Sequence, residues 1–458
     1  MNSIIASALL GVGMMFSGII FRKSQQIQWA AILSIVILMA VSIVDYVYSG
    51  EGTQVMYGMI EISQQSAWFN VLITFCCVVY FFIFHKHIAE VGKNDAEYFA
   101  LIFFVMCGVY LLTSYSNLLI LFIGIEILSI PQYILAGSDK ESFKSNEASL
   151  KYFLMGAFST GILLMGMALL YGASGSFDVL SSAFMQQFQS VEGMSSMSVV
   201  GILLMIISFA FKVSAAPMHM WTPDVYDGTP TAFTPFMATI VKVSVFVAFM
   251  RLFQYSFHNV ANSWQVIIVG IIALTLLIGN VTAVYQQSVK RMMAYSSIAQ
   301  AGFMLFSIFA LNATAIKGMT LYSVAYTLAS LGVFAVLVKM KDYTYDGFNG
   351  MAKKYPVLAF TAAICLFSLV GIPLTGGFFA KYMVLSATME QGKMIGIIIF
   401  AVLMAAVSAY YYFKVIMSMY FKDGEVDLQY QPTQAENALL IINAIMVIIL
   451  GLMPEIVF

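Results

Sequence analysis

The sequence predicts an all-α integral membrane protein of fourteen transmembrane helices. Of its 458 residues, 61% are hydrophobic, whereas soluble domains contain about 45–50%. Only 9% are Asp, Glu, Lys or Arg, against about 25% in a soluble protein. So few charges cannot cover a water-exposed surface, which excludes a cytosolic enzyme, a nucleic-acid-binding protein and a disordered chain. At roughly 20 residues per crossing plus a short connection, the length predicts about 13 to 15 spans and no large soluble domain.

The apolar runs separate into fourteen segments, most of them long enough to cross the hydrocarbon of a bilayer. The first begins almost directly after Met1, no positive charge precedes it, and another span follows, so we expect no cleaved signal peptide. We divide the chain into an N-terminal group at 1–97, a first repeat at 98–253, a second repeat at 263–420 and a last span at 437–458. The spans are expected at residues 4–20, 29–47, 67–84, 98–112, 118–135, 151–171, 198–216, 231–253, 263–284, 294–311, 316–338, 358–390, 395–419 and 437–453.

Two of these spans have the composition of broken helices. Residues 358–390 would form a straight helix about 48 Å long, which is too long for one crossing and too short for two. This stretch contains GIPLTGG at 371–377, and span 7 runs into Pro217. Broken helices at corresponding positions of two halves are typical of transporters built from inverted repeats. We therefore expect spans 4–8 and 9–13 to form two inverted five-helix repeats, interrupted in spans 7 and 12.

Lys and Arg are distributed unevenly between the two sides of the expected bundle. One side carries only Arg251, Lys317 and Lys393. By the positive-inside rule the richer side is cytoplasmic, and an even number of spans then places both termini on the periplasmic side of a bacterial cytoplasmic (inner) membrane. The richer side holds Arg22, Lys23, Lys86, Lys93, Lys140, Lys144, Lys290, Arg291, Lys339, Lys341, Lys353, Lys354 and Lys422, with Lys151 and Lys414 at helix ends.

Four ionisable residues lie inside apolar runs: Glu126 in span 5, Lys212 in span 7, Lys242 in span 8 and Lys381 in span 12. Such a residue at the bilayer centre costs at least about 2.5–3.5 kcal/mol and is normally paired or faces water. A static ion pair would explain one lysine but not three, and snorkelling would explain lysines near span ends but not Lys242 at the centre of span 8. Because burial disfavours the charged forms of lysine and glutamate, the set suits proton exchange near neutral pH. Glu126 and Lys212 are expected within ion-pair distance or sharing a water.

Three further polar residues lie near these spans. The sequence leaves two roles open for Lys151 and for His219, and favours a structural role for Asp224. Lys151 lies four residues after Glu147, which allows either an i,i+4 pair at the helix end or a part in proton uptake. His219 follows Lys212 by seven residues, across a proline, and suits either a proton relay or a hydrogen-bonded structural role at the helix break. Asp224, in the loop after span 7, is expected as a turn or capping residue.

Motifs for cofactors are missing from the sequence. It contains no Walker A motif, no dinucleotide fingerprint and no haem or iron–sulfur cysteine pattern, so no cofactor is expected in this chain. The four cysteines stand in apolar runs without metal-type spacing and are expected as small buried hydrophobic residues. No metal site is expected at His85 and His87, because no carboxylate or thiol cluster accompanies them. The energy for moving an ion must then come from another gradient or from a partner subunit.

Four stretches of the chain read as sequence motifs. They are FKVSAAPMHMWTPDVYDGTPT at 211–231, KRMMAYSSIAQAG at 290–302, EASLKYF at 147–153 and GIPLTGGFFAK at 371–381. These stretches, the first most specifically, resemble the N-type antiporter-like membrane subunits of respiratory complex I, and the resemblance covers roughly residues 98–420. Relatives of the L and M types and the cation/proton antiporters usually have WLPDA where this chain has WTPDV. The L type also carries a long lateral helix after its last spans, which is not expected here.

The resemblance implies a central hydrophilic axis for proton movement. In such subunits Glu126 would be the glutamate that pairs with Lys212, Lys242 the connecting lysine and Lys381 the terminal lysine. Quinone reduction in other subunits would be coupled to proton translocation through this chain, which itself performs no redox chemistry. One departure is Gln300, where many relatives have histidine. A neutral amide cannot replace histidine in proton transfer, so this position is expected to work differently here.

The resemblance also implies partners. NAD, FMN, iron–sulfur clusters and quinone are expected in partner subunits of a proton-translocating NADH–quinone oxidoreductase. Antiporter-like M-type and small K- and J-type membrane subunits are expected next to this chain, together with membrane lipids, and no nucleic acid. Two other functions stay open: a subunit of a cation/proton antiporter or membrane-bound hydrogenase, and a scaffold subunit that conducts nothing. The stretch at 221–226 favours the oxidoreductase over the antiporter, and the three intramembrane lysines favour conduction over a scaffold.

Overall fold

The computed structural model describes residues 1–50, 52–392 and 394–458, and these are almost entirely helical. This confirms the predicted all-α class. The first helices are α1 (Asn2–Ile20), α2 (Ser24–Val47), α3 (Gln64–Ala89), α4 (Asp95–Ser114), α5 (Leu118–Ala136) and α6 (Phe143–Ser174). They are followed by α7 (Ser182–Gln187), α8 (Ser196–Lys212), α9 (Thr222–Gly228), α10 (Thr234–Phe236), a π-helical turn η1 (Met237–Val241) and α11 (Lys242–Ser256).

The second half of the chain continues with a similar set of long helices. It comprises the 3₁₀ turn η2 (His258–Val260), α12 (Ala261–Val284), α13 (Val289–Ala310), α14 (Ala313–Leu337), η3 (Asp346–Phe348), α15 (Met351–Lys354), α16 (Pro356–Val370), α17 (Gly376–Met389), α18 (Ile395–Phe421), α19 (Gln434–Leu452) and η4 (Pro454–Val457).

Twelve helices in the described part of the chain are long and apolar enough to cross a membrane. A thirteenth is obtained only when the segment Asp346–Lys354 is joined to α16 across a bend of 117°. The predicted fourteen are therefore not all present as whole helices. The two predicted spans that are not whole helices are spans 7 and 12, which the sequence predicted to be broken. In the structure α8 ends at Lys212, and the stretch expected at 358–390 is divided into α16 and α17.

A small β-hairpin, which the sequence did not predict, joins α2 to α3. Strands β1 (Thr53–Val55) and β2 (Ile60–Ile62) pair antiparallel, with Thr53 opposite Ile62. Each strand has only three residues, too few to show an alternating pattern in the sequence. Arg251 Nη2 donates to Glu61 Oε2 of β2 at 2.9 Å, so the hairpin is fastened to α11. Arg251, expected on the lysine-poor side near the end of the span at 231–253, is a buried residue of α11.

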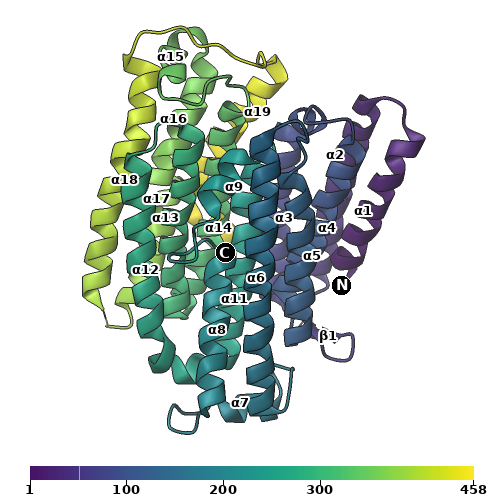
Figure 1. Ribbon diagram of the computed structural model, residues 1–458, viewed down its shortest axis with the longest axis vertical. Helices are drawn as coiled ribbons and strands as arrows, with labels where there is room; N and C mark the ends of the chain where they lie inside the picture. The colour runs from purple at the N-terminus through teal and green to yellow at the C-terminus, as the bar shows by residue number, and fades with distance from the viewer. Residues whose placement is uncertain (51, 393) are drawn as a thin grey trace.

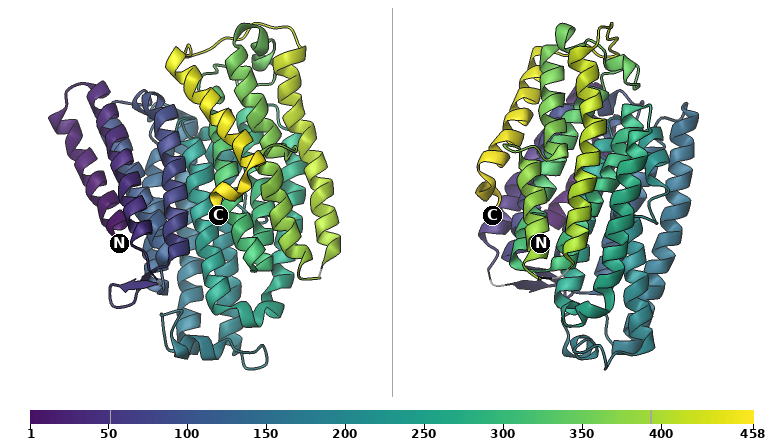
Figure 2. Two further views of the ribbon diagram at one scale, coloured as in Figure 1. Left: turned by 180° about the vertical axis from the view of Figure 1, so that it is seen from behind. Right: turned by 90° about the vertical axis from the view of Figure 1, so that its left-hand side faces the viewer.

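The long helices run side by side along one direction, with α1 and α2 at one edge and α18 at the other (Figure 1). In the first half α4 packs on α5, and α6 packs on α8 and α9; in the second half α12 packs on α13, and α14 packs on α16 and α17. Figure 2 shows α19 as a tilted helix at the back, where it contacts α14, α16 and α17. The π-turn and α11, α13 and α14 are the most buried of the long helical segments and form the centre of the bundle.

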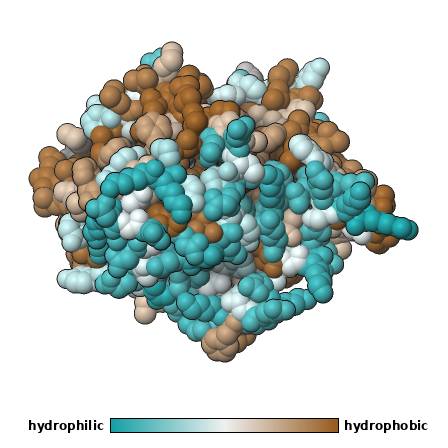
Figure 3. Space-filling model, turned by 90° about the horizontal axis from the view of Figure 1, so that it is seen from above, coloured by the Kyte–Doolittle hydropathy of each residue, from teal (hydrophilic) through white to brown (hydrophobic). Residues whose placement is uncertain are grey.

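The lysine-rich side predicted from the sequence forms one end of the bundle. Figure 3 looks onto this end and shows hydrophilic residues gathered over most of it, with hydrophobic residues around part of its rim. Glu436 at the start of α19 accepts hydrogen bonds from Lys86 of α3 at 2.9 Å and from Lys339, just after α14, at 2.6 Å. Lys290 belongs to the first turn of α13 and is buried, although it was expected in a connection. Lys393, expected on the opposite side, lies outside the described residues.

Candidate functional site

The first helix break follows α8, as the sequence predicted. Pro217 has no backbone N–H and cannot continue the helical hydrogen-bond pattern. The groups that the break frees are bonded to polar side chains: Ala216 N donates to Thr275 Oγ1 of α12 at 2.9 Å, and Trp221 Nε1 donates to the Phe211 carbonyl at 3.1 Å. These bonds keep the interrupted backbone satisfied inside the bundle.

Lys212 is the last residue of α8, and its ammonium reaches across to α5. Its Nζ donates to Ser129 Oγ at 2.8 Å and lies 3.5 Å from Tyr133 Oη. Lys212 is 8% exposed, so these hydroxyls replace most of its contact with water. The ammonium is therefore held by hydroxyl groups, which can both accept and donate hydrogen bonds.

Glu126 lies one turn before Ser129 on α5, and its carboxylate has a different partner. Glu126 Oε1 accepts a hydrogen bond from Thr160 Oγ1 of α6 at 2.8 Å. No salt bridge within 4.0 Å joins Glu126 to Lys212. Of the two predicted arrangements, the shared water stays a prediction, and the direct ion pair does not form between these two described residues. The reason is that Ser129 holds the ammonium while Thr160 holds the carboxylate.

Lys242 occupies the centre of the bundle, directly after the π-helical turn. It is 1% exposed, and its Nζ donates to both the carbonyl oxygen, at 3.1 Å, and the hydroxyl of Ser297 on α13. The ammonium also lies 5.7 Å from the centre of the Tyr226 ring. A π-turn inserts one extra residue into a helix and often marks a functional site. The sequence located Lys242 in an apolar run but gave no sign of this turn.

The second break separates α16 from α17. Gly371 ends α16 with φ = 90°, a conformation in which a side chain is strained, and a Cβ there would lie 3.1 Å from Lys381 Cδ. Lys381, in the second turn of α17, donates to the Leu369 and Val370 carbonyls, both at 2.8 Å. Its Nζ also lies 4.6 Å from the centre of the Phe303 ring. The ammonium thus caps the C-terminal end of α16, where the helix dipole is negative.

Gln300 of α13 connects this second break to two neighbouring helices. Its Nε2 donates to the Leu369 carbonyl at 2.9 Å and lies 3.2 Å from Tyr412 Oη of α18. Its Oε1 accepts a hydrogen bond from Tyr322 of α14. Gln300 and Lys381 therefore bind the same carbonyl oxygen. The sequence marked Gln300 only as a departure from relatives, and nothing in it singled out the two tyrosines.

Lys151 belongs to an ion cluster at the side of the first break. Its Nζ lies 2.7 Å from Glu147, as the i,i+4 spacing predicted, and 2.7 Å from Asp224. Arg291 of α13 binds the other Asp224 oxygen at 2.8 Å. Asp224 was expected as a turn or capping residue, but it joins α6 to α13 through α9. His219 is buried, and its Nδ1 has no hydrogen-bond partner among the described residues.

A polar cavity of about 370 Å³ opens at the lysine-rich end, between the two halves of the chain. Lys290 and Asp227 line it, and Lys290 Nζ donates to the Asp227 and Thr229 carbonyls at 2.8 and 2.7 Å. Glu90 also lines it, and burial raises the pKa of that carboxyl above its ordinary value. The cavity is large enough for several waters and is polar enough to hold them.

The buried lysines share one chemical property. Lys212, Lys242 and Lys381 bind hydroxyl or carbonyl oxygens, and no described carboxylate forms a salt bridge with any of them. For Lys242 and Lys381, which have no carboxylate partner among the described residues, loss of the proton leaves no unpaired anion in a salt bridge. Within the described residues, no group of three or more His, Cys, Asp or Glu side chains could hold a metal ion. The arrangement suits stepwise proton transfer.

Comparison with known proteins relates this arrangement to a family. Residues 116–408 match the family described as NADH:quinone oxidoreductase/Mrp antiporter, transmembrane. NADH-quinone oxidoreductase subunit N of Cytophaga hutchinsonii is 37% identical over 465 residues, covering 100% of this chain and 98% of that protein. The subunit of the same name from Flavobacterium psychrophilum is 33% identical over 461 residues, covering 100% of this chain and 99% of the relative.

Solved structures share the fold along nearly the whole chain. A chain of respiratory complex I from Thermus thermophilus is 28% identical, with a TM-score of 0.84 over 99% of this chain and 98% of that one. A chain of the Mrp complex from Dietzia is 17% identical, with a TM-score of 0.85 over 99% of this chain and 95% of its own length. At that identity, the second likeness concerns the fold alone.

Proposed function

We propose a function from the premise that this chain belongs to the NADH:quinone oxidoreductase/Mrp antiporter membrane family. It is a proton-translocating, antiporter-like subunit of an NADH–quinone oxidoreductase, of the N type. Identity of 33–37% to N subunits over the full length supports the N type. The observation that carries the proposal is the series of buried lysines Lys212, Lys242 and Lys381, each bound to neutral oxygen acceptors.

In this proposal protons move along the middle of the bundle between the two breaks. Glu126 and Lys212 form the first station, Lys242 connects the halves, and Lys381 is the terminal station. Lys151 and Asp224 lie beside the first station, where Lys151 takes part in proton uptake. The side chain of His219, with a free ring nitrogen, relays protons at the first break.

The proposed membrane topology has fourteen spans. The twelve whole spanning helices are completed by two broken ones, α8 with α9 and α16 with α17. Spans 4–8 and 9–13 form two inverted five-helix repeats, which the similar packing of α6 on α8 and of α14 on α17 supports. The lysine-rich end faces the cytoplasm, both termini are periplasmic, and the polar cavity beside Lys290 admits protons from the cytoplasmic side of the bacterial inner membrane.

Redox chemistry takes place in other subunits in this proposal. NAD, FMN, iron–sulfur clusters and quinone are bound there, and their turnover drives proton movement through this chain. M-type and small K- and J-type membrane subunits lie next to it. The exposed apolar side chains along α1, α6 and α18 supply surface for such neighbours and for lipid.

Substitution of Lys242 tests the proposal. We expect Lys242→Met and Lys242→Arg to assemble normally yet to lower NADH-driven proton pumping in inverted membrane vesicles. Met removes the titratable group, and Arg keeps a charge but cannot release a proton at accessible pH. Lys317→Met, an exposed lysine of α14, is the matched control and should pump normally. Full pumping by an assembled Lys242→Arg variant would show that Lys242 is a fixed charge.

A further inference from the structure

A groove of about 910 Å³ lies between α1, the turn into α2 and the connection from α3 to α4. This volume falls within the range of sites that bind small molecules, about 300–1,000 Å³. None of the buried lysines lines it, so it is separate from the proposed proton path. Its lining comes mainly from α1 and the connection from α3 to α4, and α1 and α2 lie at one edge of the bundle (Figure 1).

One wall of the groove is an apolar stripe of α1. Val12, Met15, Phe16 and Ile19 follow the i, i+3, i+4, i+7 spacing of one helix face. All four are exposed, between 44% and 80%. From Val12 to Phe21 the wall is about 14 Å long at 1.5 Å per residue. Because α1 crosses the membrane, this stripe lies beside hydrocarbon rather than water.

The mouth of the groove is charged, and it lies at the end of α1. Arg22 and Lys93 line it, together with Glu97 and the buried Asp95. Asp95 already accepts a hydrogen bond from Ser24 Oγ at 2.6 Å. No salt bridge of the described residues uses Arg22, Lys93 or Glu97, so two cations and one carboxylate are free to bind a ligand. The groove is therefore apolar along its length and charged with both signs at one end.

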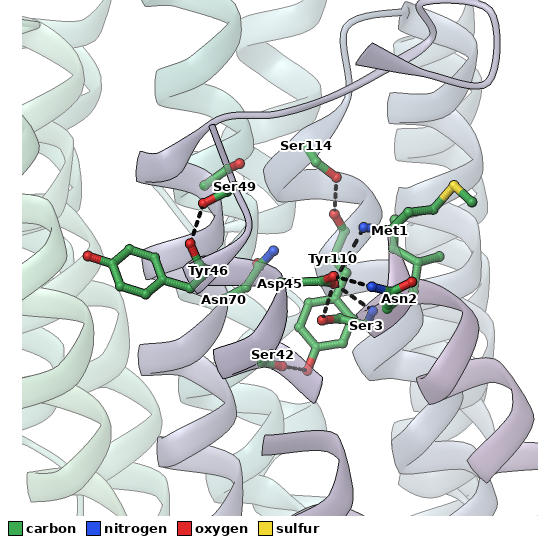
Figure 4. A network of polar contacts seen from close by, with 12 residues as sticks. Met1, Asn2, Ser3, Ser42, Asp45, Tyr46, Ser49, Asn70, Tyr110 and Ser114 are labelled. Atoms are coloured by element: carbon green, nitrogen blue, oxygen red, sulfur yellow. Dashed lines mark hydrogen bonds and ion pairs between the residues drawn. The ribbon is translucent and has the colours of Figure 1, made fainter. Parts of the chain in front are cut away.

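The helices that form the groove are fixed at their opposite end. Figure 4 shows Asp45 of α2 accepting hydrogen bonds from Asn2 and Ser3 of α1, at 2.8 Å from Asn2 Nδ2 and 2.7 Å from Ser3 Oγ. Farther into the bundle, Tyr110 of α4 lies 3.3 Å from Ser42 Oγ of α2. These contacts join α1 to α2 at the end remote from the groove, whose lining on α1 begins at Val12.

We propose that this groove binds one phospholipid whose headgroup is zwitterionic and carries a primary ammonium, as in phosphatidylethanolamine. The acyl chain lies along the stripe from Val12 to Ile19. The phosphate lies between Arg22 and Lys93, and the ammonium faces Glu97. A purely anionic headgroup would place negative charge beside Glu97 without a matching ammonium, and a neutral glyceride would leave both cations unpaired. The site does not depend on the proposed function of the chain.

Photolabelling of the whole respiratory complex tests this proposal. The complex is placed in phosphatidylcholine vesicles containing a diazirine-acyl phosphatidylethanolamine or the matching phosphatidylglycerol, irradiated, digested and mapped by mass spectrometry. We expect the ethanolamine probe to label residues 12–19. In an Arg22→Ala/Lys93→Ala variant, the amount of label on residues 12–19 should fall about fivefold, because the exposed charges that bind the phosphate are removed. Lys23→Ala is the matched control, since it removes a neighbouring charge that does not line the groove.

A second variant keeps the headgroup site and fills the groove. Met15→Trp places a larger side chain at an exposed position, so it should fold normally and also lose the label. Equal labelling of the wild type and the double alanine variant would mean bulk lipid only and overturn the proposal. Equal or stronger labelling by the glycerol probe would overturn the zwitterionic headgroup. Absence of label at 12–19 in the wild type would also overturn the proposal, because no phospholipid would then occupy the groove in the complex.

Discussion

At the first break the lysine is the last residue of the half-helix before the gap, whereas at the second it lies in the half-helix after the gap. Lys212 reaches sideways to the hydroxyls of α5, while Lys381 reaches back to the carbonyls that its own break has freed. A hydroxyl both accepts and donates, but a carbonyl only accepts. In the proposed proton path, Lys212 therefore has a neighbouring hydroxyl that could both accept and donate a proton, whereas the carbonyls bound by Lys381 could not donate one.

The groups that satisfy the two breaks also differ. Pro217 interrupts the first helix, and side chains of α12 and of Trp221 satisfy the freed groups. Gly371 and Pro373 interrupt the second, and Lys381 itself satisfies the freed carbonyls. The lysine thus has a structural part at the second break that it lacks at the first. Substitutions at the second break should therefore affect assembly as well as pumping.

The largest effect is expected from Gly377→Ala. A Cβ at this position would overlap the Ser368 carbonyl oxygen, a backbone atom that cannot move aside without shifting α16. We expect the variant to lose assembly, measured as the amount of intact complex on a native gel. Gly396→Ala is the matched control, since a Cβ there has no neighbour within 4 Å, and it should assemble normally. Normal assembly of Gly377→Ala would contradict the close approach of α17 to α16.

The second effect concerns the hydroxyl that distinguishes the first break. We expect Ser129→Ala to assemble and to lower pumping about tenfold, because a hydrogen bond to a charged group contributes about 1.5–3 kcal/mol and about 1.4 kcal/mol is a factor of ten. Ser386→Ala, whose hydroxyl bonds only to the Met383 carbonyl within its own helix, serves as the control. Pumping rates per assembled complex decide the result, and unchanged pumping in Ser129→Ala would mean that Tyr133 or water holds Lys212 equally well.

Gln300 offers a smaller effect at the second break. Gln300→Leu removes one of the two donors to the Leu369 carbonyl and leaves Lys381 as the other. Because a neutral hydrogen bond contributes about 1 kcal/mol, we expect pumping to fall about threefold to fivefold with the complex still assembled. Gln300→His keeps a donor and should retain more activity than Gln300→Leu. Equal pumping by the two variants would show that no hydrogen bond is needed at this position.

The smallest effect is expected from Glu147→Gln, in the ion cluster beside the first break. Its pair with Lys151 is 45% and 40% exposed, and an exposed i,i+4 pair contributes only a few tenths of a kcal/mol. Pumping should change less than about twofold. Asp224→Asn is the informative comparison, since Asp224 binds both Lys151 and Arg291 and its loss should cost more. If Glu147→Gln and Asp224→Asn change the pumping rate equally little, the ion cluster around Lys151 has no part in proton uptake.

The membrane class, the helical composition and the positions of both breaks could be predicted from composition and from proline and glycine. Each of these depends on local chemistry, such as the missing N–H of Pro217 or the positive φ of Gly371. The hairpin at 53–62 and the π-turn before Lys242 could not, because three-residue strands and a single wide turn leave no periodic pattern. The predicted count of fourteen spans exceeds the number of whole spanning helices, twelve in the described part of the chain, because two of the predicted spans are broken.

The ionisable residues inside the membrane can be found from the sequence, because Glu126, Lys212, Lys242 and Lys381 stand out in apolar runs. Their hydrogen-bond partners depend on how the helices pack. Thr160 on α6 holds Glu126, Ser129 on α5 holds Lys212, and Ser297 on α13 holds Lys242. These acceptors are ordinary serines and threonines that no motif distinguishes, and the residues they bind lie 34 to 83 positions away in the chain. Charge at a position is a property of one side chain, but its hydrogen-bond partner depends on how distant helices pack.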